Sequence, residues 1–223
     1  MKPFRLFVTG TDTGVGKTEA ACALLSLLAD ARLHPAAMKP YESGVGDGGP
    51  ADALALALAA RSDDDLALVC PHRFEEPLAP GVAAAREGRV ASFAKTLRAF
   101  QAFDERPLVV EGAGGLLVPV DARREMIDLV RAMKLPVLLV ARAGLGTLNH
   151  TALSLEALRR RRLQTLAVLL VRGPTRDPSE ADNAEWIAKR HGVRVLGPVP
   201  FEPDVRRRRT AFRRALRPLV MAG

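Results

Sequence analysis

Aromatic residues are scarce in this chain of 223 residues, where phenylalanine, tyrosine and tryptophan together make up 4% of the sequence. Hydrophobic residues of all kinds still reach 48%, so the core must be built mainly from alanine, leucine and valine. This length and apolar content are enough to bury a full core, and we expect a single domain over residues 1–223.

Cysteine is nearly absent, since Cys22 and Cys70 are its two occurrences. Their spacing fits neither a metal-binding motif nor a disulfide framework, and we expect reduced thiols in a cytoplasmic protein. No apolar run approaches the length of a membrane span, so we expect no membrane partner. The first strand is expected directly after Met1–Phe4, which leaves no room for a signal peptide.

Acidic residues are missing from the C-terminal segment, and this imbalance accounts for most of the net charge of +8. Residues 206–217 contain seven arginines and no aspartate or glutamate. A charge run alone is weak support for polyanion binding, and no alternation with aromatic residues provides stacking surfaces for nucleic acid. We therefore expect a solvated basic helix or tail over about 206–223 and no nucleic-acid partner.

Apolar runs typical of strands alternate with helical patterns along the chain. Near-continuous Val/Leu strands separated by helices predict an α/β fold, with one doubly wound, mostly parallel sheet covered on both faces. The predicted strands are Arg5–Thr9, Pro35–Lys39, Leu108–Glu111, Val137–Ala141, Leu166–Val171 and Val195–Leu196. The predicted helices are Lys17–Ala31, Ala51–Arg61, Ser92–Phe103, Arg124–Met133, Leu148–Arg161 and Ser179–Arg190.

A glycine-rich turn joins the first predicted strand to the first predicted helix: Gly10-Thr11-Asp12-Thr13-Gly14-Val15-Gly16-Lys17-Thr18. Its glycines let backbone N–H groups surround a phosphate, and the helix N-terminus adds its positive dipole end. Lys17 is expected to reach the β- and γ-phosphates, and the Thr18 hydroxyl to bind Mg²⁺. The turn departs from the general phosphate-loop pattern, because its first glycine comes one residue early and Thr11 stands in that place.

Two more predicted strands end near this loop, because the carboxyl ends of parallel strands share one edge of the sheet. Lys39 closes the second strand, where another ammonium group can stabilise charge during phosphoryl transfer, and Ser43 offers a hydroxyl to a substrate. Glu111 closes the third strand, where an acid is typical of a Mg²⁺ ligand. Asp52 is a further candidate oxygen ligand, although its spacing equally favours a helix N-cap.

Glycines also precede the helix predicted from Leu148, with Thr147 as its possible N-cap. The N–H groups at such a helix start form a site for an anion such as a carboxylate. His150 lies in this motif, and we assign it no acid–base role.

These motifs, in this order and at these distances, resemble the dethiobiotin synthetases, ATP-dependent carboxylases that close the ureido ring in biotin synthesis. The resemblance covers most of the chain and rests on GTDTGVGKT (10–18), KPYESG (39–44), DAL (52–54), EGAGG (111–115) and GTLNHT (146–151). The family's phosphate loop has the same one-residue departure. The resemblance implies a phosphate-loop NTPase fold, ATP with Mg²⁺, and the substrates 7,8-diaminononanoate and CO₂.

The resemblance also implies roles for individual residues. Lys17 and Lys39 would neutralise the carbamate and the γ-phosphate, and Thr11 and Ser43 would bind the carbamate or the diamine. Mg²⁺ would be held by Thr18, Asp52 and Glu111. Leu148, Asn149 and His150 of a neighbouring subunit would bind the substrate carboxylate. The resemblance therefore implies a homodimer. The nucleotide would contact Thr13, Gly14, Val15, Gly16, Lys17, Thr18, Asp52, Glu111, Gly112, Ala113, Gly114, Arg172, Gly173, Pro200, Phe201 and Glu202.

One position departs from the family pattern. Many members read adenine with an Asn-Asp pair after the fifth strand, where this chain has Arg172-Gly173. An asparagine side chain offers both a donor and an acceptor to a base, whereas arginine offers donors alone. We therefore expect weaker discrimination among nucleoside triphosphates than in members with asparagine.

Two other classes of protein compete with this interpretation. One is a related phosphate-loop ATPase, either of the cobyrinate amidation type or of the partitioning type. A partitioning ATPase normally carries an extra lysine near the start of the loop, where this chain has Gly10-Thr11-Asp12, and neither cysteine suits a glutaminase. The other is a non-catalytic nucleic-acid-binding module that uses the C-terminal arginines.

Overall fold

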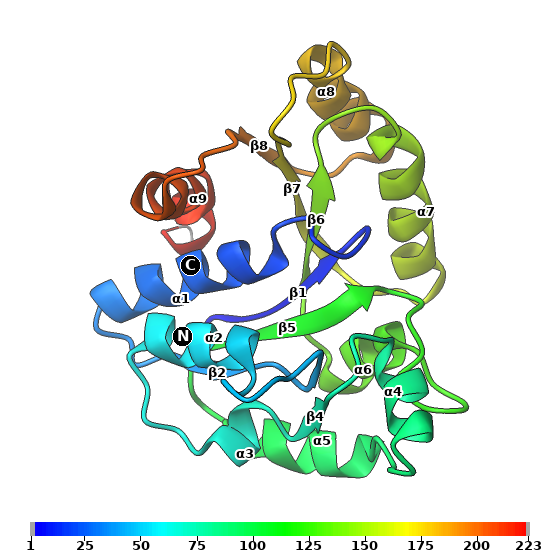
Figure 1. The fold of residues 1–223 in the computed structure, drawn as a ribbon. Coiled ribbons are helices and arrows are strands. Elements are labelled where there is room, and N and C mark those ends of the chain that lie inside the picture. The colour runs from blue at the N-terminus through cyan, green and yellow to red at the C-terminus, as the bar shows by residue number, and fades with distance from the viewer. Residues whose placement is uncertain (1–2, 222–223) are drawn as a thin grey trace.

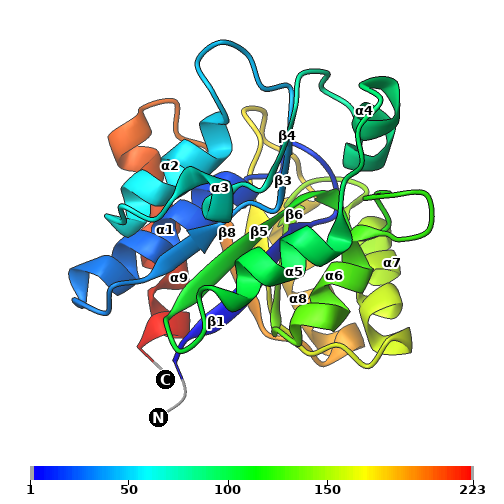
Figure 2. The ribbon, with the colours of Figure 1, turned by 90° about the horizontal axis from the view of Figure 1, so that it is seen from below.

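The computed structural model describes residues 3–221 (Figures 1 and 2). Within them, six parallel strands form one sheet, ordered β2 (Ala36–Met38), β5 (Leu108–Gly115), β1 (Arg5–Gly10), β6 (Val137–Arg142), β7 (Thr165–Val171) and β8 (Val195–Val199). β1 pairs with β5 on one side and with β6 on the other. The loops that leave the sheet beside β1 therefore diverge, which is where open α/β sheets bind ligands.

Helices cover both faces of the sheet, as Figure 2 shows. Successive side chains of a strand point to opposite faces, so Leu6 and Val8 of β1 pack with α1, whereas Phe7 joins the core on the other side. One face carries α1 (Lys17–Asp30), α2 (Ala51–Ala60) and α9 (Val205–Val220). The other carries α5 (Phe93–Gln101), α6 (Met126–Met133), α7 (Thr147–Arg160) and α8 (Glu180–His191). The predicted doubly wound α/β fold is confirmed.

Four short elements were not predicted: β3 (Tyr41–Ser43), α3 (Leu66–Val69), β4 (His72–Phe74) and α4 (Pro80–Arg86). Each is too short for apolar periodicity to reveal it. β3 and β4 pair with each other in a separate two-stranded parallel sheet. This small sheet carries Ser43 and fixes the direction of the chain after Lys39.

The C-terminal arginines belong to a packed helix. The apolar side chains of Phe212, Leu216 and Leu219 on α9 are buried, and α9 packs against α1. Arg213 of α9 lies 2.6 Å from the carboxylate of Asp30 at the end of α1. Residues 222 and 223 of the predicted basic segment lie outside the described residues. No helix between residues 3 and 221 is long and apolar enough to cross a membrane.

Candidate active site

A cavity of about 820 Å³ opens at the carboxyl edge of the sheet. The phosphate-loop turn, the ends of several strands and the start of α9 line it. The sequence-predicted residues in this lining are Thr13, Gly14, Val15, Gly16, Lys17, Thr18, Lys39, Ser43, Asp52, Glu111, Ala113, Gly114, Arg172, Gly173, Pro200 and Phe201.

The turn between β1 and α1 has the backbone that a phosphate loop needs. Gly14 and Gly16 have φ values of 64° and 98°, which disfavour any residue with a Cβ. A Cβ at Gly16 would also lie 3.2 Å from the ring of Phe212. The Lys17 ammonium folds back over the turn and donates to the carbonyl of Asp12 at 2.7 Å. Burial, aided by the nearby charge of Lys39, lowers the pKa of Lys17 to about 8.

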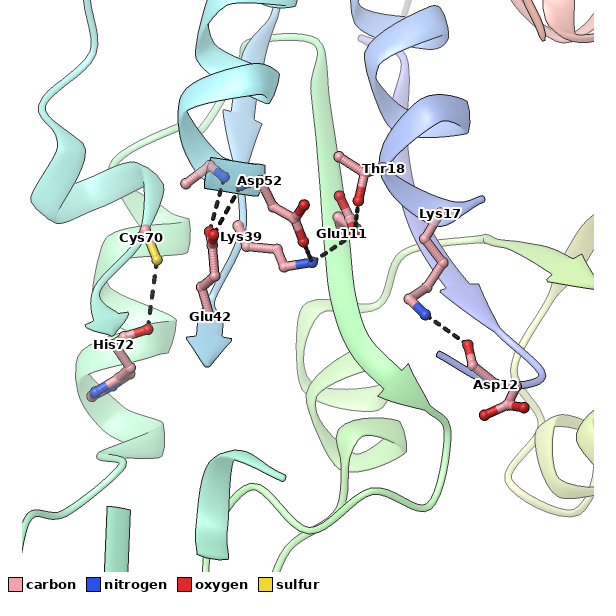
Figure 3. A network of polar contacts seen from close by, with 10 residues as sticks. Asp12, Lys17, Thr18, Lys39, Glu42, Asp52, Cys70, His72 and Glu111 are labelled. Atoms are coloured by element: carbon pink, nitrogen blue, oxygen red, sulfur yellow. Dashed lines mark hydrogen bonds and ion pairs between the residues drawn. The ribbon is translucent and has the colours of Figure 1, made fainter. Parts of the chain in front are cut away.

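Lys39 lies at the centre of a polar cluster on the cavity wall (Figure 3). Its Nζ donates to Glu111 Oε1 at 2.6 Å and to Asp52 Oδ2 at 2.7 Å. Glu111 Oε1 also accepts the hydroxyl of Thr18 at 2.9 Å. The alternative that Asp52 is a helix N-cap is wrong, because Pro50 is the N-cap and Asp52 lies in the first turn of α2. Its carboxylate is therefore available to the cavity.

The cluster is an ion-pair network in which Lys39 and Glu111 are buried, whereas the side chain of Asp52 is partly exposed. Burial raises the pKa of Glu111, and the positive charge of Lys39 opposes this shift. Burial also disfavours the charged form of Lys39, but the carboxylates of Glu111 and Asp52 outweigh it and raise its pKa. The cluster therefore keeps a positive charge on Lys39 at neutral pH.

Two buried side-chain oxygens of cavity-lining residues have no hydrogen-bond partner among residues 3–221: Glu111 Oε2 and Ser43 Oγ. Leaving such an atom buried and unpaired costs about 1–3 kcal/mol. Both residues line the cavity. Their unpaired oxygens are therefore available to a ligand there.

A second cavity of about 440 Å³ adjoins the first, because Thr13, Gly114 and Val118 line both. Thr11 and His150 line this second cavity, while Leu148 and Asn149 line neither of the two. Thr11 and Lys39 thus line different, adjoining cavities.

The start of α7 differs from the prediction in its N-cap. Gly146, with φ of 91°, occupies that position, and Thr147 is the first helical residue. The left-handed backbone explains why glycine rather than threonine is found there. Leu145 N donates to the Asp177 carboxylate at 2.7 Å. Asn183 Nδ2 of α8 donates to the carbonyl of Ala143 at 2.8 Å, so side chains from the β7–α8 loop and from α8 hold this segment.

The part of the cavity lined by the ends of β7 and β8 and by α9 has cationic and apolar side chains. Arg172 Nε lies 2.9 Å from Glu180 Oε2, an ion pair outside hydrogen-bond geometry.

Two of the predicted nucleotide contacts do not line the cavity. Gly112 packs into the core, where a Cβ would lie 2.9 Å from the Phe7 ring, and Glu202 directs its carbonyl to Arg208 at 3.4 Å.

Sequence reasoning missed several residues that line the cavity. Arg142 is the last residue of β6, and its guanidinium lies 3.5 Å from the Asp12 carboxylate. Arg208 and Phe212 come from α9. Their spacing of four residues, which puts two side chains on one helix face, was the available signal, but it was hidden within the arginine run.

Comparisons with known proteins agree with this geometry. Residues 5–209 match the AAA domain family. An ATP-dependent dethiobiotin synthetase BioD from Anaeromyxobacter dehalogenans is 51% identical over 93% of this chain and 94% of its own length. One from Rhodococcus jostii is 42% identical over 87% of this chain and 85% of its own.

Among solved structures, the signal recognition particle receptor FtsY from Elizabethkingia anophelis aligns with a TM-score of 0.51 at 16% identity. The alignment covers 95% of this chain and 65% of that longer one, and it shows a shared fold alone. The curated relatives match nearly full length and at much higher identity. The chain belongs to the ATP-dependent dethiobiotin synthetase family.

Proposed function

We propose that this chain uses ATP to carboxylate 7,8-diaminononanoate with CO₂ and to close the ring of dethiobiotin. Its curated relatives carry the name of that activity. The observation that carries the proposal is the position of Lys39 between Asp52 and Glu111, on the wall of the cavity that the phosphate loop also lines.

Thr18, Asp52 and Glu111 would hold Mg²⁺. The unpaired, buried Oε2 of Glu111 fits this role, since carboxylate and hydroxyl oxygens are the ligands that Mg²⁺ prefers. Water and phosphate oxygens usually complete such a set. When bound, the ion would neutralise charge on the phosphates.

The reaction needs positioned reactants and neutralised charge rather than a histidine proton relay. One amine adds to CO₂ and loses a proton, which gives a carbamate. A carbamate oxygen attacks the γ-phosphorus and ADP leaves, which gives a carbamic–phosphoric anhydride. The second amine attacks the carbonyl carbon, expels phosphate and closes the five-membered ring.

Four side chains would serve these steps. The ammonium groups of Lys17 and Lys39 would neutralise the carbamate and the γ-phosphate. Ser43, whose buried hydroxyl lacks a partner among residues 3–221, would bind the carbamate or the diamine. Thr11 would also bind the carbamate or the diamine, from the adjoining cavity.

A homodimer would complete the substrate site. The carboxylate of 7,8-diaminononanoate would bind the N–H groups at the start of α7 of a neighbouring subunit, through Leu148, Asn149 and His150. Exposed leucines around this helix support an interface: Leu117, Leu145, Leu148 and Leu153 are 55%, 87%, 43% and 58% exposed. Apolar side chains gathered in this way are typical of protein interfaces.

Neither rival class is favoured. The curated relatives support a synthetase over amidation or partitioning ATPases. The apolar side of α9 is buried against the rest of the chain, which argues against a separate nucleic-acid-binding module. We expect the enzyme to act in the cytoplasm, where ATP is made and where Cys22 and Cys70 would stay reduced.

Phosphate release tests the proposed function. The assay contains ATP, Mg²⁺, bicarbonate and 7,8-diaminononanoate, and each component is omitted in turn. We expect release to depend on all four, with dethiobiotin formed in equal amount. Phosphate release that continues without the diamine would remove the assignment.

Nucleotide selectivity should be weak, because Arg172 offers donors alone to the base. We expect kcat/KM for ATP to exceed that for CTP or GTP by less than about a hundredfold, some 2.7 kcal/mol. Arg172→Asn should widen the preference for ATP. A larger preference in the wild type, or an unchanged one in the variant, would contradict this role of Arg172.

Nucleotide binding should take up a proton in alkaline solution. In the free protein the pKa of Lys17 is about 8, and a bound triphosphate favours the ammonium form and raises it. Affinity should therefore be nearly constant below pH 7 and fall by up to about tenfold per pH unit above pH 8. Calorimetry at pH 8.5 in buffers of different ionisation enthalpy measures the uptake. Absence of uptake there would show that Lys17 is already fully charged.

A further inference from the structure

Glu42, which follows Lys39 by three residues, is a buried carboxylate with no role in the reaction steps above. It lies on β3 with 7% of its surface exposed. Its Oε1 accepts the backbone N–H of Asp52 at 2.8 Å, and its Oε2 accepts that of Ala53 at 2.9 Å. Figure 3 shows this side chain pointing to the first turn of α2.

These two hydrogen bonds cap the N-terminus of α2. The first N–H groups of a helix lack intrahelical partners, and a residue at the N-cap normally accepts one of them. The N-cap of α2 is Pro50, which makes no side-chain hydrogen bond to the helix. A carboxylate from a different strand therefore caps α2, and its negative charge also suits the positive end of the helix dipole.

The segment that connects β3 to α2 cannot hold the helix in place by itself. Residues 44–50 read GVGDGGP, so four of the seven are glycines, and Gly44 and Gly49 have φ values of 76° and 83°. Glycine has the largest backbone freedom of all residues. Packing of Ala53 and Leu56 in the core holds the body of α2, and the contact with Glu42 adds a fixed point at its first turn, close to Lys39.

What Glu42 holds is the backbone of Asp52 itself. The Asp52 carboxylate lies 2.7 Å from the Lys39 ammonium, which in turn lies 2.6 Å from Glu111. The side chain of Asp52 is 41% exposed, so little packing fixes it. Its direction follows from the backbone at the start of α2, which packing of Ala53 and Leu56 holds on the core side and the two hydrogen bonds to Glu42 hold at the first turn.

We propose that Glu42 is a positioning residue, which orients Asp52 towards Lys39 and the Mg²⁺ site by capping α2 from a neighbouring strand. This inference rests on the proposed function for the use of Asp52. Partners that orient a metal ligand typically change metal affinity or activity by about 10–100-fold when they are removed.

The test uses Glu42→Gln, which keeps the shape of the side chain but can no longer accept at both oxygens, and Glu42→Ala. We expect kcat to fall and the Mg²⁺ concentration for half-maximal rate to rise, each by about 10–100-fold. The Kd of ATP without Mg²⁺ should stay within about twofold in both variants, because Glu42 makes its hydrogen bonds to α2 and not to the phosphate loop. Glu42→Gln should be the milder variant.

A readout besides turnover is amide hydrogen exchange. The amides of Asp52 and Ala53 should lose protection in both variants, and calorimetry with a non-hydrolysable ATP analogue should show weakened Mg²⁺ binding. The matched control is Asp65→Ala, which removes the side-chain cap of α3, where Asp65 accepts the N–H of Ala67 at 2.8 Å. This control should leave the Mg²⁺ requirement unchanged.

Two results would overturn the proposal. One is a Mg²⁺ requirement and kcat of Glu42→Gln within about twofold of wild type. The other is an equal loss in Asp65→Ala, which would mean that any weakened helix cap has the same effect. If Glu42→Ala does not fold, Glu42→Gln decides the outcome. A wild-type protein without diamine-dependent phosphate release would defeat the proposed function, while amide exchange and Mg²⁺ calorimetry would still test Glu42.

Discussion

Lys39→Ala should lower kcat by about 10²–10³-fold while the Kd of ATP changes by less than about fivefold. Removing one preorganised group that stabilises developing charge has an effect of this size. Lys39 is buried, and its charge is secured by Glu111 and Asp52. The nucleotide keeps its phosphate loop and Lys17, so binding should survive. Diamine-dependent phosphate release and calorimetry measure the two quantities.

Loss of fold must be separated from loss of chemistry in this variant. Lys39→Ala leaves Glu111 buried without its counter-charge, and breaking a buried pair in this way costs about 3–5 kcal/mol. Thermal unfolding should therefore be measured beside turnover. Lys39→Arg keeps the positive charge in a different shape and should be more stable, with an intermediate rate. Lys189→Ala, at an exposed position on α8, is the neutral control.

The Lys39→Ala variant also distinguishes a synthetase from a nucleic-acid-binding module. In such a module Lys39→Ala would have little effect, and the exposed arginines of α9 would carry the activity. We expect the opposite, with turnover within about twofold of wild type when Arg206, Arg207 and Arg214 are replaced by glutamine. Unchanged turnover in Lys39→Ala would contradict the proposed role of this lysine.

Leu145→Arg should convert a dimer into monomers and lower kcat/KM for the diamine by about 10²-fold. Leu145 is 87% exposed beside the start of α7. A charge at this position would be desolvated in an interface, and the neighbour's N–H groups would no longer reach the substrate carboxylate. Hydrogen bonds to a charged group contribute about 1.5–3 kcal/mol each, which sets the size of the loss. Light scattering and steady-state kinetics measure the two effects.

Leu58→Arg is the matched control for this prediction. Leu58 is a leucine on α2 with 73% exposure, away from α7. The Leu58→Arg variant should leave both the dimer and the kcat/KM for the diamine unchanged. Monomers in Leu58→Arg and dimers in Leu145→Arg would move the interface to α2, and the proposed carboxylate site would then be wrong.

Much of the fold was predictable because long elements carry strong periodic patterns. The six strands of the main sheet and the six longer helices between them were predicted with ends within a few residues. The largest strand error was β5, which continues to Gly115 because that residue pairs with Gly10 of β1. The small sheet of β3 and β4 was missed, since three residues carry no period and their pairing joins Tyr41 to His72.

Some residues of the candidate site were likewise predictable from the sequence, and others were not. Lys17, Lys39 and Glu111 were predictable because each stands beside a strand end or a glycine-rich turn, and parallel strands bring their carboxyl ends together. Arg208 and Phe212 were not, because a helix distant in sequence contributes them to the cavity. The role of Glu42 was not predicted, because its partners lie ten and eleven positions further along the chain.

The sequence by itself determined the fold class, the phosphate-loop turn and the set of charged residues at the sheet edge. These features depend on local order, glycine positions and strand ends, which are properties of short segments. Tertiary structure alone decided which charges meet: Lys39 lies between Asp52 and Glu111, Glu42 caps α2, and α9 lines the cavity. Such contacts depend on the packing of distant segments against one another, and no local pattern encodes a partner's position.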